Sequence, residues 1–416
     1  MKKFDVCVLG LGYIGLPTAS VLATKGKSVL GVDTSPTVLK SIQEGRIDLL
    51  EPDLDIIVKA AVQSGNLQLS PKPQPADVFI IAVPTPLQDR TDASICDLSF
   101  VESAARSVAS CVKSCDLIIL ESTSPVGTTE RVREWIYDEI SKQKAPNMNS
   151  LRLYFAYGPE RVLPGQMLKE LVTNDRIAGG LDTHAAKMAA ALYRTFCSGE
   201  IYLTDSRTAE MVKLTENAFR DVNIAFANEI SMISDEMNLN SQEVICLASR
   251  HPRVKILRPG PGVGGHCIAV DPWFIVQNAP EHSKLIRAAR EVNNAKPLHI
   301  IKKIRAQARL LKEPVIACLG LVFKANVSDL RESPALQIVS KIAEENIGRV
   351  LVVEPNIQKL PPILLGQSNV FSTELDHSLQ EADIIVILVA HREFRSIIEA
   401  KLADKIVIDV VGLLEN

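Results

Sequence analysis

The chain has 416 residues, of which 46% are hydrophobic and 23% are charged, and its net charge is -3. That length exceeds one ordinary core, so we expect two or three domains. Because there is no basic block and no apolar run longer than a strand, the composition argues against binding of nucleic acid or membranes. The eight cysteines are scattered without a CxxC pair, which is typical of reduced thiols in a cytoplasmic protein.

A dinucleotide fingerprint opens the chain. The motif Gly10-Leu11-Gly12-Tyr13-Ile14-Gly15 lies between a predicted strand, Phe4–Leu9, and a predicted helix over residues 14–23. The first glycine permits a tight turn, the second lets a pyrophosphate approach, and the third lets helix and strand pack closely. The next predicted strand, residues 28–32, ends in Asp33. Its carboxylate would bind ribose hydroxyls and repel a 2′-phosphate, which favours NAD over NADP.

Polar residues follow three later predicted strands. The strands over residues 77–83, 116–120 and 151–156 lead to Thr85, to Glu121 and Thr123, and to Glu160. Ligands bind beyond the carboxyl ends of strands in open parallel sheets. These residues are therefore candidates for cofactor or substrate contacts, with ordinary turn chemistry as the alternative.

A long helix is predicted over residues 208–237, which contain no glycine or proline and have apolar residues at helical spacing. We expect it to link domains. Lys213 and Asn217 lie one turn apart on one face. They either point together into a cleft or belong to a solvated face.

The stretch from Pro259 to Trp273 is rich in glycine and contains Gly264-Gly265-His266-Cys267, with Asp271 four residues later. Such glycine density lets a backbone approach a ligand closely. We predict that Cys267 is a nucleophile and Asp271 its acid/base partner, and the alternative is a buried structural cysteine. We expect no metal, because adjacent residues on an extended loop point apart and no second Cys/His cluster completes a zinc site.

The last third is predicted to be a second α/β unit. It follows a helical run over residues 284–311, which we expect to break at Pro297. Strands are predicted over residues 315–320, 349–353, 383–389 and 405–410, and a helix over residues 335–345. The first strand leads to a turn without GxGxxG, which is typical of a mononucleotide-type fold. Lys324 and Arg331 in this region are candidate phosphate donors.

An NAD site and a cysteine nucleophile together indicate oxidation of an aldehyde through a thiohemiacetal and a thioester. Two alternatives stay open. A two-electron hydroxy-acid dehydrogenase would share the NAD site and the long helix but needs no cysteine. A non-catalytic NAD-sensing protein would have no use for a lysine, a cysteine and an aspartate together.

Ordered motifs along the chain resemble the UDP-glucose/GDP-mannose dehydrogenase family over essentially its whole length. The matching pieces are Gly10–Pro17, Val83-Pro84-Thr85-Pro86, Glu121-Ser122-Thr123, Lys213 with Asn217, Gly264–Cys267, Asp271, and Phe323-Lys324 with Asp329–Ser333. The resemblance implies two Rossmann-like, doubly wound domains joined by a central helical domain with a long connecting helix. The corresponding boundaries are residues 1–200, 201–308 and 309–416. It also implies a homodimer formed through the long helix.

The activity implied by this resemblance is a four-electron oxidation of the C6 hydroxymethyl group of a nucleotide sugar to a carboxylate, with two NAD molecules used in succession. The Gly-Gly-His-Cys form of the loop resembles the branch that acts on UDP-N-acetylhexosamines. The residues around it, including Arg258, Ala269 and Trp273, resemble those of the members that act on UDP-N-acetyl-D-mannosamine, so the resemblance implies this sugar as substrate. UDP-N-acetyl-D-glucosamine is the alternative, since the two sugars differ only at C2.

Residue roles also follow from the resemblance. The catalytic set comprises Cys267, Lys213, Asp271, Asn217, Glu160 and Thr123. The cofactor-binding set comprises Gly10, Gly12, Tyr13, Ile14, Gly15, Asp33, Thr85, Thr123 and Arg331. The substrate-binding set comprises Glu160, Arg161, Lys213, Asn217, Arg250, Arg253, Gly264 and Lys324, with one of the two arginines at 250 and 253 expected to reach a neighbouring subunit. The chain departs from the family at Val162-Leu163-Pro164, where a second acid is usual.

Overall fold

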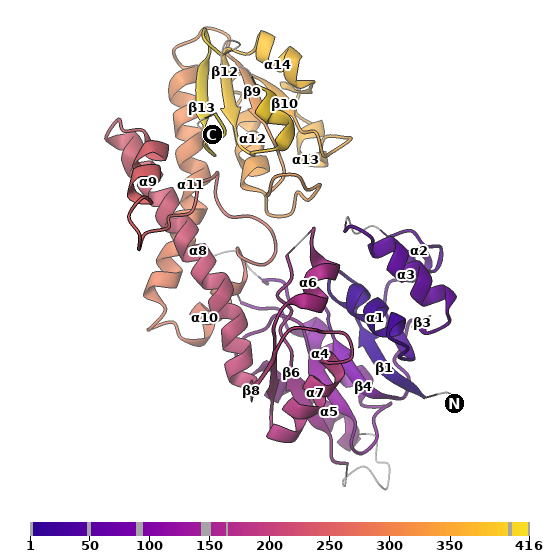
Figure 1. Cartoon of the computed structure of the whole chain (residues 1–416). Coiled ribbons are helices and arrows are strands. Elements are labelled where there is room, and N and C mark those ends of the chain that lie inside the picture. Colours follow the sequence, from indigo (N-terminus) through magenta and orange to yellow (C-terminus); the bar gives the residue numbers. More distant parts are fainter. Residues whose placement is uncertain are drawn as a thin grey trace. The chain divides into compact units, whose positions relative to one another are not determined.

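The computed structural model of the protein describes residues 3–47, 51–88, 95–142, 151–163, 165–397 and 402–414. The chain divides into two compact units (Figure 1). The first comprises Met1–Glu216 together with Trp273–Asn278, and the second comprises Asn217–Pro272 together with Ala279–Asn416. Among the described residues, no helix combines the length and the apolar character needed to cross a membrane.

The described part of the first unit contains an eight-stranded sheet with the order β3-β2-β1-β4-β5-β6-β7-β8. Neighbouring strands are parallel except β6 and β7. The strands are β1 (Phe4–Leu9), β2 (Val29–Val32), β3 (Leu67–Ser70), β4 (Ala76–Ile81), β5 (Leu117–Leu120), β6 (Tyr154–Tyr157), β7 (Arg176–Gly180) and β8 (Ile201–Asp205).

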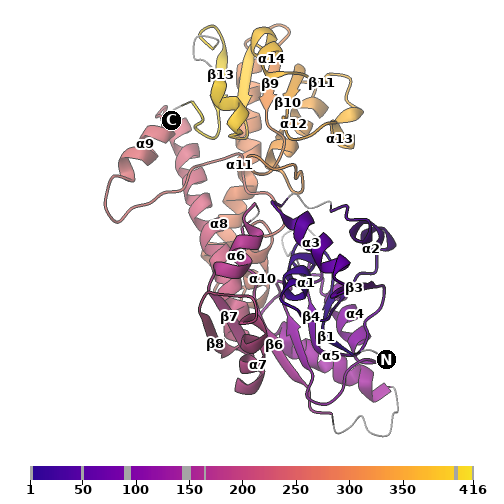
Figure 2. The ribbon, with the colours of Figure 1, turned by 45° about the vertical axis from the view of Figure 1, so that its right-hand side comes forward.

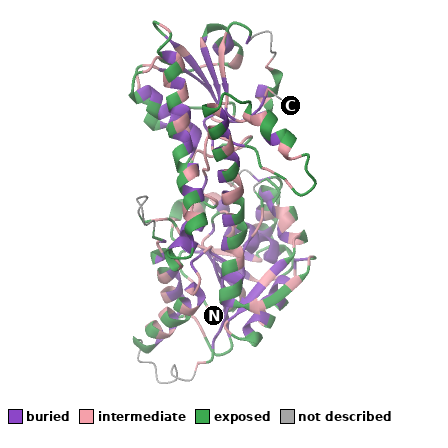
Figure 3. Cartoon of the chain, turned by 90° about the vertical axis from the view of Figure 1, so that its left-hand side faces the viewer, coloured by how far each residue is buried: buried purple, intermediate pink, exposed green. Residues whose placement is uncertain are grey.

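Helices cover this sheet on both faces. Successive strand residues point to opposite faces, and all four residues of β5 are buried, so neither face of the sheet centre is open to solvent. Buried residues line the strands of the protein in general (Figure 3). The helices are α1 (Gly15–Thr24), α2 (Pro36–Gln43), α3 (Leu54–Gln63), α4 (Ser99–Val108), α5 (Thr128–Lys142), α6 (Met167–Thr173), α7 (Thr183–Tyr193) and α10 (Asp271–Asn278).

The second unit contains a five-stranded parallel sheet with the order β11-β10-β9-β12-β13. The strands are β9 (Val315–Leu319), β10 (Arg349–Val353), β11 (Val370–Ser372), β12 (Ile384–Ile387) and β13 (Ile406–Asp409). The shorter helices are α9 (Ser241–Ala248), α12 (Pro334–Glu344), α13 (Pro362–Leu365), α14 (Leu375–Glu381) and the 3-10 turn η2 (Arg392–Ser396). In chain order, both sheets place their third, second, first, fourth and fifth strands side by side, as expected for two doubly wound folds.

Two long helices complete the structure. Helix α8 (Ser206–Glu236) starts in the first unit and continues into the second, where it lies beside α11 (Lys284–Ala308) (Figures 1 and 2). The predicted break at Pro297 is wrong, because α11 continues through it. Proline has no N–H to donate to the carbonyl oxygen of Asn293, so one hydrogen bond of the helix is lost. That carbonyl oxygen faces Gly262: a Cβ added to Gly262 would lie 3.1 Å from it. Packing of α11 outweighs the lost hydrogen bond.

Candidate active site

The three glycines of the turn after β1 differ in how much space surrounds them: Gly10 and Gly15 are tightly packed, and Gly12 is not. Gly10 has φ = +91°, and a Cβ there would lie 2.5 Å from the carbonyl oxygen of Ala82. A Cβ on Gly15 would overlap the carbonyl oxygen of Gly10, whereas a Cβ on Gly12 would meet no atom within 4 Å. Gly10 and Gly15 are therefore required by packing, and the open space at Gly12 suits an approaching pyrophosphate.

Asp33 closes the same turn. Its Oδ2 accepts a hydrogen bond from the backbone N–H of Leu11 at 3.0 Å, and its Oδ1 accepts from that of Ser35 at 2.9 Å. The side chain is only half-buried, so its carboxylate retains lone pairs for a ribose. Nearby, Tyr13 donates its hydroxyl to Glu51, and Ile14 precedes the first residue of α1. This geometry fits an NAD site.

The loops after β4 and β5 meet at the carboxyl edge of the sheet. The hydroxyl of Thr85 donates to the carbonyl oxygen of Thr123 at 2.7 Å. Glu121 is buried two residues earlier, and its Oε1 accepts from the Tyr193 hydroxyl at 2.9 Å. Burial raises the pKa of Glu121 to about 7, against the attraction of Arg176.

Lys213 is anchored beside Glu160 within the first unit. The Lys213 ammonium donates to the backbone carbonyl of Glu160 at 2.8 Å. The Glu160 carboxylate accepts from the Arg176 guanidinium at 2.6 Å and from the backbone N–H of Arg161 at 2.8 Å. Arg161 itself pairs with Glu216 at 2.7 Å. Both carboxylate oxygens of Glu160 are thus engaged, and its catalytic role stays a prediction.

In the second unit, the cysteine loop (Gly264–Cys267) packs against the loop that follows β9. The backbone N–H of Gly265 donates to the carbonyl oxygen of Arg331 at 3.1 Å. A Cβ on Gly264 would lie 2.8 Å from Cβ of Phe323, and one on Gly265 would lie 2.9 Å from the ring of Phe323. The two glycines therefore permit a close approach that other residues would prevent. Cys267 follows two residues later, and its side chain is exposed.

Asp271 and Asn217 are in contact within the second unit. Asp271 is buried at the start of α10, and its Oδ2 accepts from the Asn217 side-chain amide. The backbone N–H of Asp271 also donates to the carbonyl oxygen of Cys267 at 2.8 Å. The amide of Asn217 thus fixes the orientation of a carboxylate that lies one turn beyond the cysteine.

A buried polar network that the sequence did not indicate holds the start of the glycine-rich stretch. The Arg290 guanidinium donates to Asp221 Oδ1 at 2.6 Å, and the Asn293 amide donates to the same oxygen at 2.8 Å. Asn293 Oδ1 accepts from the Asn228 amide at 2.9 Å, and Asn228 Oδ1 accepts from the backbone N–H of Gly260 at 2.9 Å. These contacts join α8, α11 and the glycine-rich stretch.

The remaining predicted ligands lie elsewhere in the second unit. Arg331 pairs with Asp329 at 2.6 Å, and Lys324 lies in the same loop after β9. Arg250 and Arg253 are exposed on the segment that follows α9. In the first unit, the departure at Val162-Leu163-Pro164 is only partly visible, because Pro164 lies outside the described residues.

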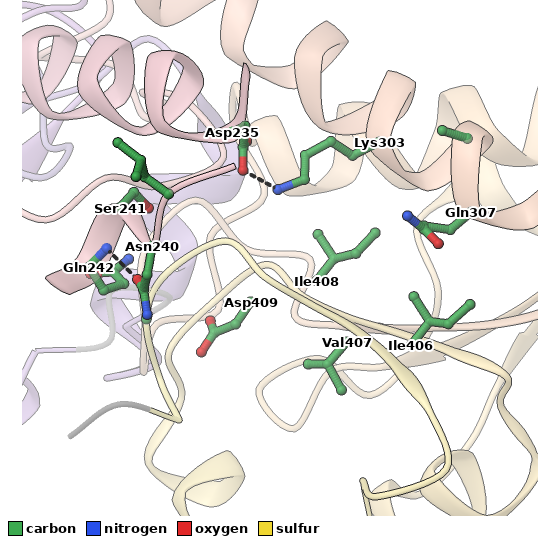
Figure 4. A pocket seen from close by; sticks show the side chains of 13 residues that line it. Asp235, Asn240, Ser241, Gln242, Lys303, Gln307, Ile406, Val407, Ile408 and Asp409 are labelled. Carbon is green, nitrogen blue, oxygen red and sulfur yellow. Dashed lines mark hydrogen bonds and ion pairs between the residues drawn. The ribbon is translucent and has the colours of Figure 1, made fainter. Parts of the chain in front are cut away.

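A pocket of about 410 Å³ lies in another part of the second unit (Figure 4). Residues from the end of α8, the start of α9, α11 and β13 line it, including Asp235, Gln242, Lys303 and Asp409. None of the predicted site residues is among its lining. Within the ranges that the structure describes, no group of three or more His, Cys, Asp or Glu side chains is placed to hold a metal ion.

Comparison with known proteins gives a family for this arrangement. Residues 4–197 match the NAD-binding domain of the UDP-glucose/GDP-mannose dehydrogenase family, residues 207–295 match its central domain, and residues 317–416 match its UDP-binding domain. The chain belongs to this family. Its predicted fold class, cofactor and enzyme class are therefore confirmed: it is an NAD-dependent nucleotide-sugar dehydrogenase.

Several members of the UDP-glucose/GDP-mannose dehydrogenase family are similar over nearly their whole length. The NDP-N-acetyl-D-galactosaminuronic acid dehydrogenase of Ralstonia nicotianae is 52% identical, over 98% of this chain and 96% of the relative. The UDP-N-acetyl-D-mannosamine dehydrogenase of Campylobacter jejuni is 50% identical, over 95% of this chain and 97% of the relative. The solved structure of UDP-D-ManNAc dehydrogenase from Pyrococcus horikoshii is 39% identical with a TM-score of 0.85, over 99% of this chain and 96% of that chain.

Proposed function

We propose that the enzyme oxidises the C6 hydroxymethyl group of a UDP-N-acetylhexosamine to a carboxylate, with UDP-N-acetyl-D-mannosamine as the first candidate. One observation carries the proposal. The exposed Cys267 follows a pair of glycines that rest against the loop after β9, within the unit that contains the UDP-binding domain of the family. A thiol next to a sugar-nucleotide site would be available for covalent catalysis.

The chemistry assigned to Cys267 balances over two oxidations. The C6 alcohol would first lose a proton and a hydride to give an aldehyde. The Cys267 thiolate would then add to this aldehyde, and the new alkoxide would take a proton to give a thiohemiacetal. Loss of hydride from C6 and of that proton gives a thioester. Water then adds to the thioester, the carbon–sulfur bond breaks, and the thiolate, a carboxylate and two protons are released. NAD supplies the hydride acceptor, twice in each turnover.

The other residues act on charges and water in this scheme. Lys213, held by the carbonyl of Glu160, would stabilise the oxyanion in both oxidation stages. Asp271, oriented by Asn217, would activate the hydrolytic water. Thr123 would position that water. The cofactor and substrate contacts predicted for Arg331, Arg161, Gly264 and Lys324 belong to the same proposal.

A substrate panel tests the reaction, with NADH formation measured for UDP-N-acetyl-D-mannosamine, UDP-N-acetyl-D-glucosamine and UDP-glucose. Two NADH per sugar acid are expected, whereas one NADH would indicate a two-electron dehydrogenase. Cys267→Ser should abolish turnover and leave NAD binding intact. Cys246→Ser, which alters another exposed cysteine, serves as the matched control. Unchanged turnover of Cys267→Ser would refute the nucleophile assignment.

The comparisons favour a second candidate substrate, which differs from the first in the configuration of the sugar. Relatives of nearly equal identity carry the names NDP-N-acetyl-D-galactosaminuronic acid dehydrogenase and UDP-N-acetyl-D-mannosamine dehydrogenase. UDP-N-acetyl-D-galactosamine therefore joins the panel. The highest kcat/KM among the N-acetylated epimers identifies the substrate, and a preference for UDP-glucose would overturn the N-acetylhexosamine assignment.

We also infer a homodimer formed through α8. Phe219, Phe226 and Ile233 recur every seven residues along this helix and are 70%, 50% and 46% exposed. An apolar stripe of this kind on an exposed helix suits a second copy of the chain. In such a dimer, Arg250 or Arg253 would reach the substrate of the partner subunit.

Light scattering coupled to size-exclusion chromatography tests the dimer. Phe226→Glu should shift the protein from dimer to monomer. Phe100→Glu, at an aromatic residue on α4 that is 49% exposed, should leave the dimer unchanged. A dimer that persists in Phe226→Glu would contradict the α8 interface. A cytoplasmic location is a further proposal, which is supported by eight described cysteines that form no disulfide.

A further inference from the structure

The second sheet has an acidic residue where the first has Asp33, but its surroundings differ. Glu354 directly follows β10, as Asp33 directly follows β2. Its Oε2 accepts from the backbone N–H of Leu321 at 2.7 Å and of Val322 at 3.2 Å. Asp33 is half-buried, whereas the Glu354 side chain is 4% exposed. Glu354 therefore holds the turn after β9 from within the protein.

His391 completes this arrangement from the segment after β12. The imidazole is fully buried, with Nε2 3.2 Å from Glu354 Oε2. Its Nδ1 accepts from the backbone N–H of Asn326 at 3.0 Å and lies 3.0 Å from the Asn356 amide nitrogen. Because two donors face Nδ1, the proton belongs on Nε2, which donates to Glu354. Burial raises the pKa of Glu354, but the hydrogen bonds that His391 and the backbone N–H groups of Leu321 and Asn356 donate to its carboxylate outweigh that effect and hold this pKa below its usual range.

The loop held by these two residues supports the cysteine loop. Glu354 fixes its start at Leu321 and Val322, and His391 fixes its middle at Asn326, which has φ = +62°. The same loop supplies the Phe323 ring and the Arg331 carbonyl oxygen against which Gly265 rests. It also carries Lys324. One buried pair thus underlies both a predicted substrate ligand and the backbone that precedes Cys267.

We propose that His391 and Glu354 are positioning residues that set the placement of Cys267 and Lys324 through the loop of residues 320–333. This inference rests on the proposed function for its catalytic consequence. Its structural content is independent of the sugar that is oxidised. The carboxylate that binds a ribose in a dinucleotide site would here bind only protein groups.

Two substitutions of His391 distinguish the hydrogen bond made by its Nδ1 from the one made by its Nε2. Asparagine at position 391 places an amide oxygen near the Nδ1 position and can still accept from Asn326. Glutamine places an amide nitrogen near the Nε2 position, and so keeps the donor to Glu354 but loses the acceptor. His391→Gln should therefore lower kcat about 10- to 100-fold, since small misplacements far from the chemistry have effects of that order. His391→Asn should keep kcat within a few-fold of the wild type.

The deciding measurement is the rate at which iodoacetamide alkylates Cys267, followed by peptide mass spectrometry without substrate. Cys246, an exposed thiol in the same unit, is the internal reference. In His391→Gln the Cys267 rate should change several-fold at constant Cys246 rate and constant NAD affinity. His377→Gln, at an exposed histidine on α14, is the matched control. Equal Cys267 rates in His391→Gln and the wild type would overturn the proposal.

Hydrogen exchange of the wild-type protein gives a second measurement, which does not depend on the folding of a variant. The amides of Asn326 and Gly265 should exchange slowly together, and rapid exchange of either would overturn the proposal. If no sugar nucleotide in the panel is oxidised while the alkylation effect is present, the proposed function fails and the positioning role stands.

Discussion

Replacing Glu121 by glutamine should remove a pH-dependent loss of stability from the first unit. The side chain is 3% exposed, and its Oε2 is a buried atom without a hydrogen-bond partner among the described residues. Burial is the largest cause of its raised pKa, and the neighbouring Glu160 adds to it. Arg176 and the Tyr193 hydroxyl act in the opposite direction. A charged carboxylate at this position is therefore unfavourable.

The magnitude follows from the difference between the two pKa values. The pKa rises from 4.5 to about 7 in the folded unit, and a tenfold change in an equilibrium corresponds to about 1.4 kcal/mol, so the full effect is about 3 kcal/mol. The folded unit binds this proton more tightly than the unfolded chain. The stabilisation is thus complete below pH 4.5 and is lost as the pH rises through 7. Relative to wild type, Glu121→Gln should gain about 2 to 3 kcal/mol between pH 5 and 8.

Tryptophan fluorescence during urea unfolding reports on the relevant unit. The chain has two tryptophans, Trp135 and Trp273, and both belong to the first unit. Free energies of unfolding for wild type and Glu121→Gln would be compared at pH 5, 6, 7 and 8. Glu134→Gln, at an exposed position on α5, controls for the loss of one charge. A difference between Glu121→Gln and wild type that does not vary with pH would refute this reasoning.

Three further substitutions test other parts of the structure. Asp33→Ser should weaken NAD binding about tenfold and weaken NADP binding less, and an unchanged ratio of the two dissociation constants would contradict the assignment. Arg290→Leu should destabilise the second unit by about 3–5 kcal/mol, because Asp221 stays buried without its cation. The double variant Arg290→Leu, Asp221→Leu should regain much of that stability. Urea unfolding of both variants, followed by hydrogen exchange, measures the two changes. Lys296→Met should stabilise the second unit by about 3 kcal/mol at pH 7, because burial lowers the pKa of this amine from 10.5 to about 8. That gain in stability should fade between pH 8 and 10.5, because the pKa of the wild-type amine is about 8 in the folded unit and 10.5 in the unfolded chain. Hydrogen exchange of α8 and α11 measures the stability, and a gain that stays the same across this pH range would contradict the prediction.

Local patterns allowed much of the fold to be predicted. The glycine motif and Asp33 lie within one strand–turn–helix–strand segment, so their geometry depends on neighbours close in sequence. The strands of both sheets were recognisable as short apolar runs because both of their faces are buried. Pro297 was misread because its local preference ends helices, while contacts with residues far away in sequence keep α11 continuous.

The supporting parts of the site gave no such signal. Asp221 and Arg290 are 69 residues apart, and each reads as an ordinary polar residue on a helix. Glu354 and His391 are 37 residues apart, and the sequence showed only that each follows a strand. Polar networks of this kind depend on which faces meet in three dimensions, and one sequence does not determine that.

The open space at Gly12 has an evolutionary consequence. A methyl group at Gly10 or Gly15 would collide with backbone, so changes there would be removed by selection for a folded protein, whatever the protein does. A methyl group at Gly12 would meet nothing in the folded chain, so only the use of a dinucleotide can keep this position as glycine. In a descendant that lost its cofactor, Gly12 would drift first while its two neighbours in the motif persisted.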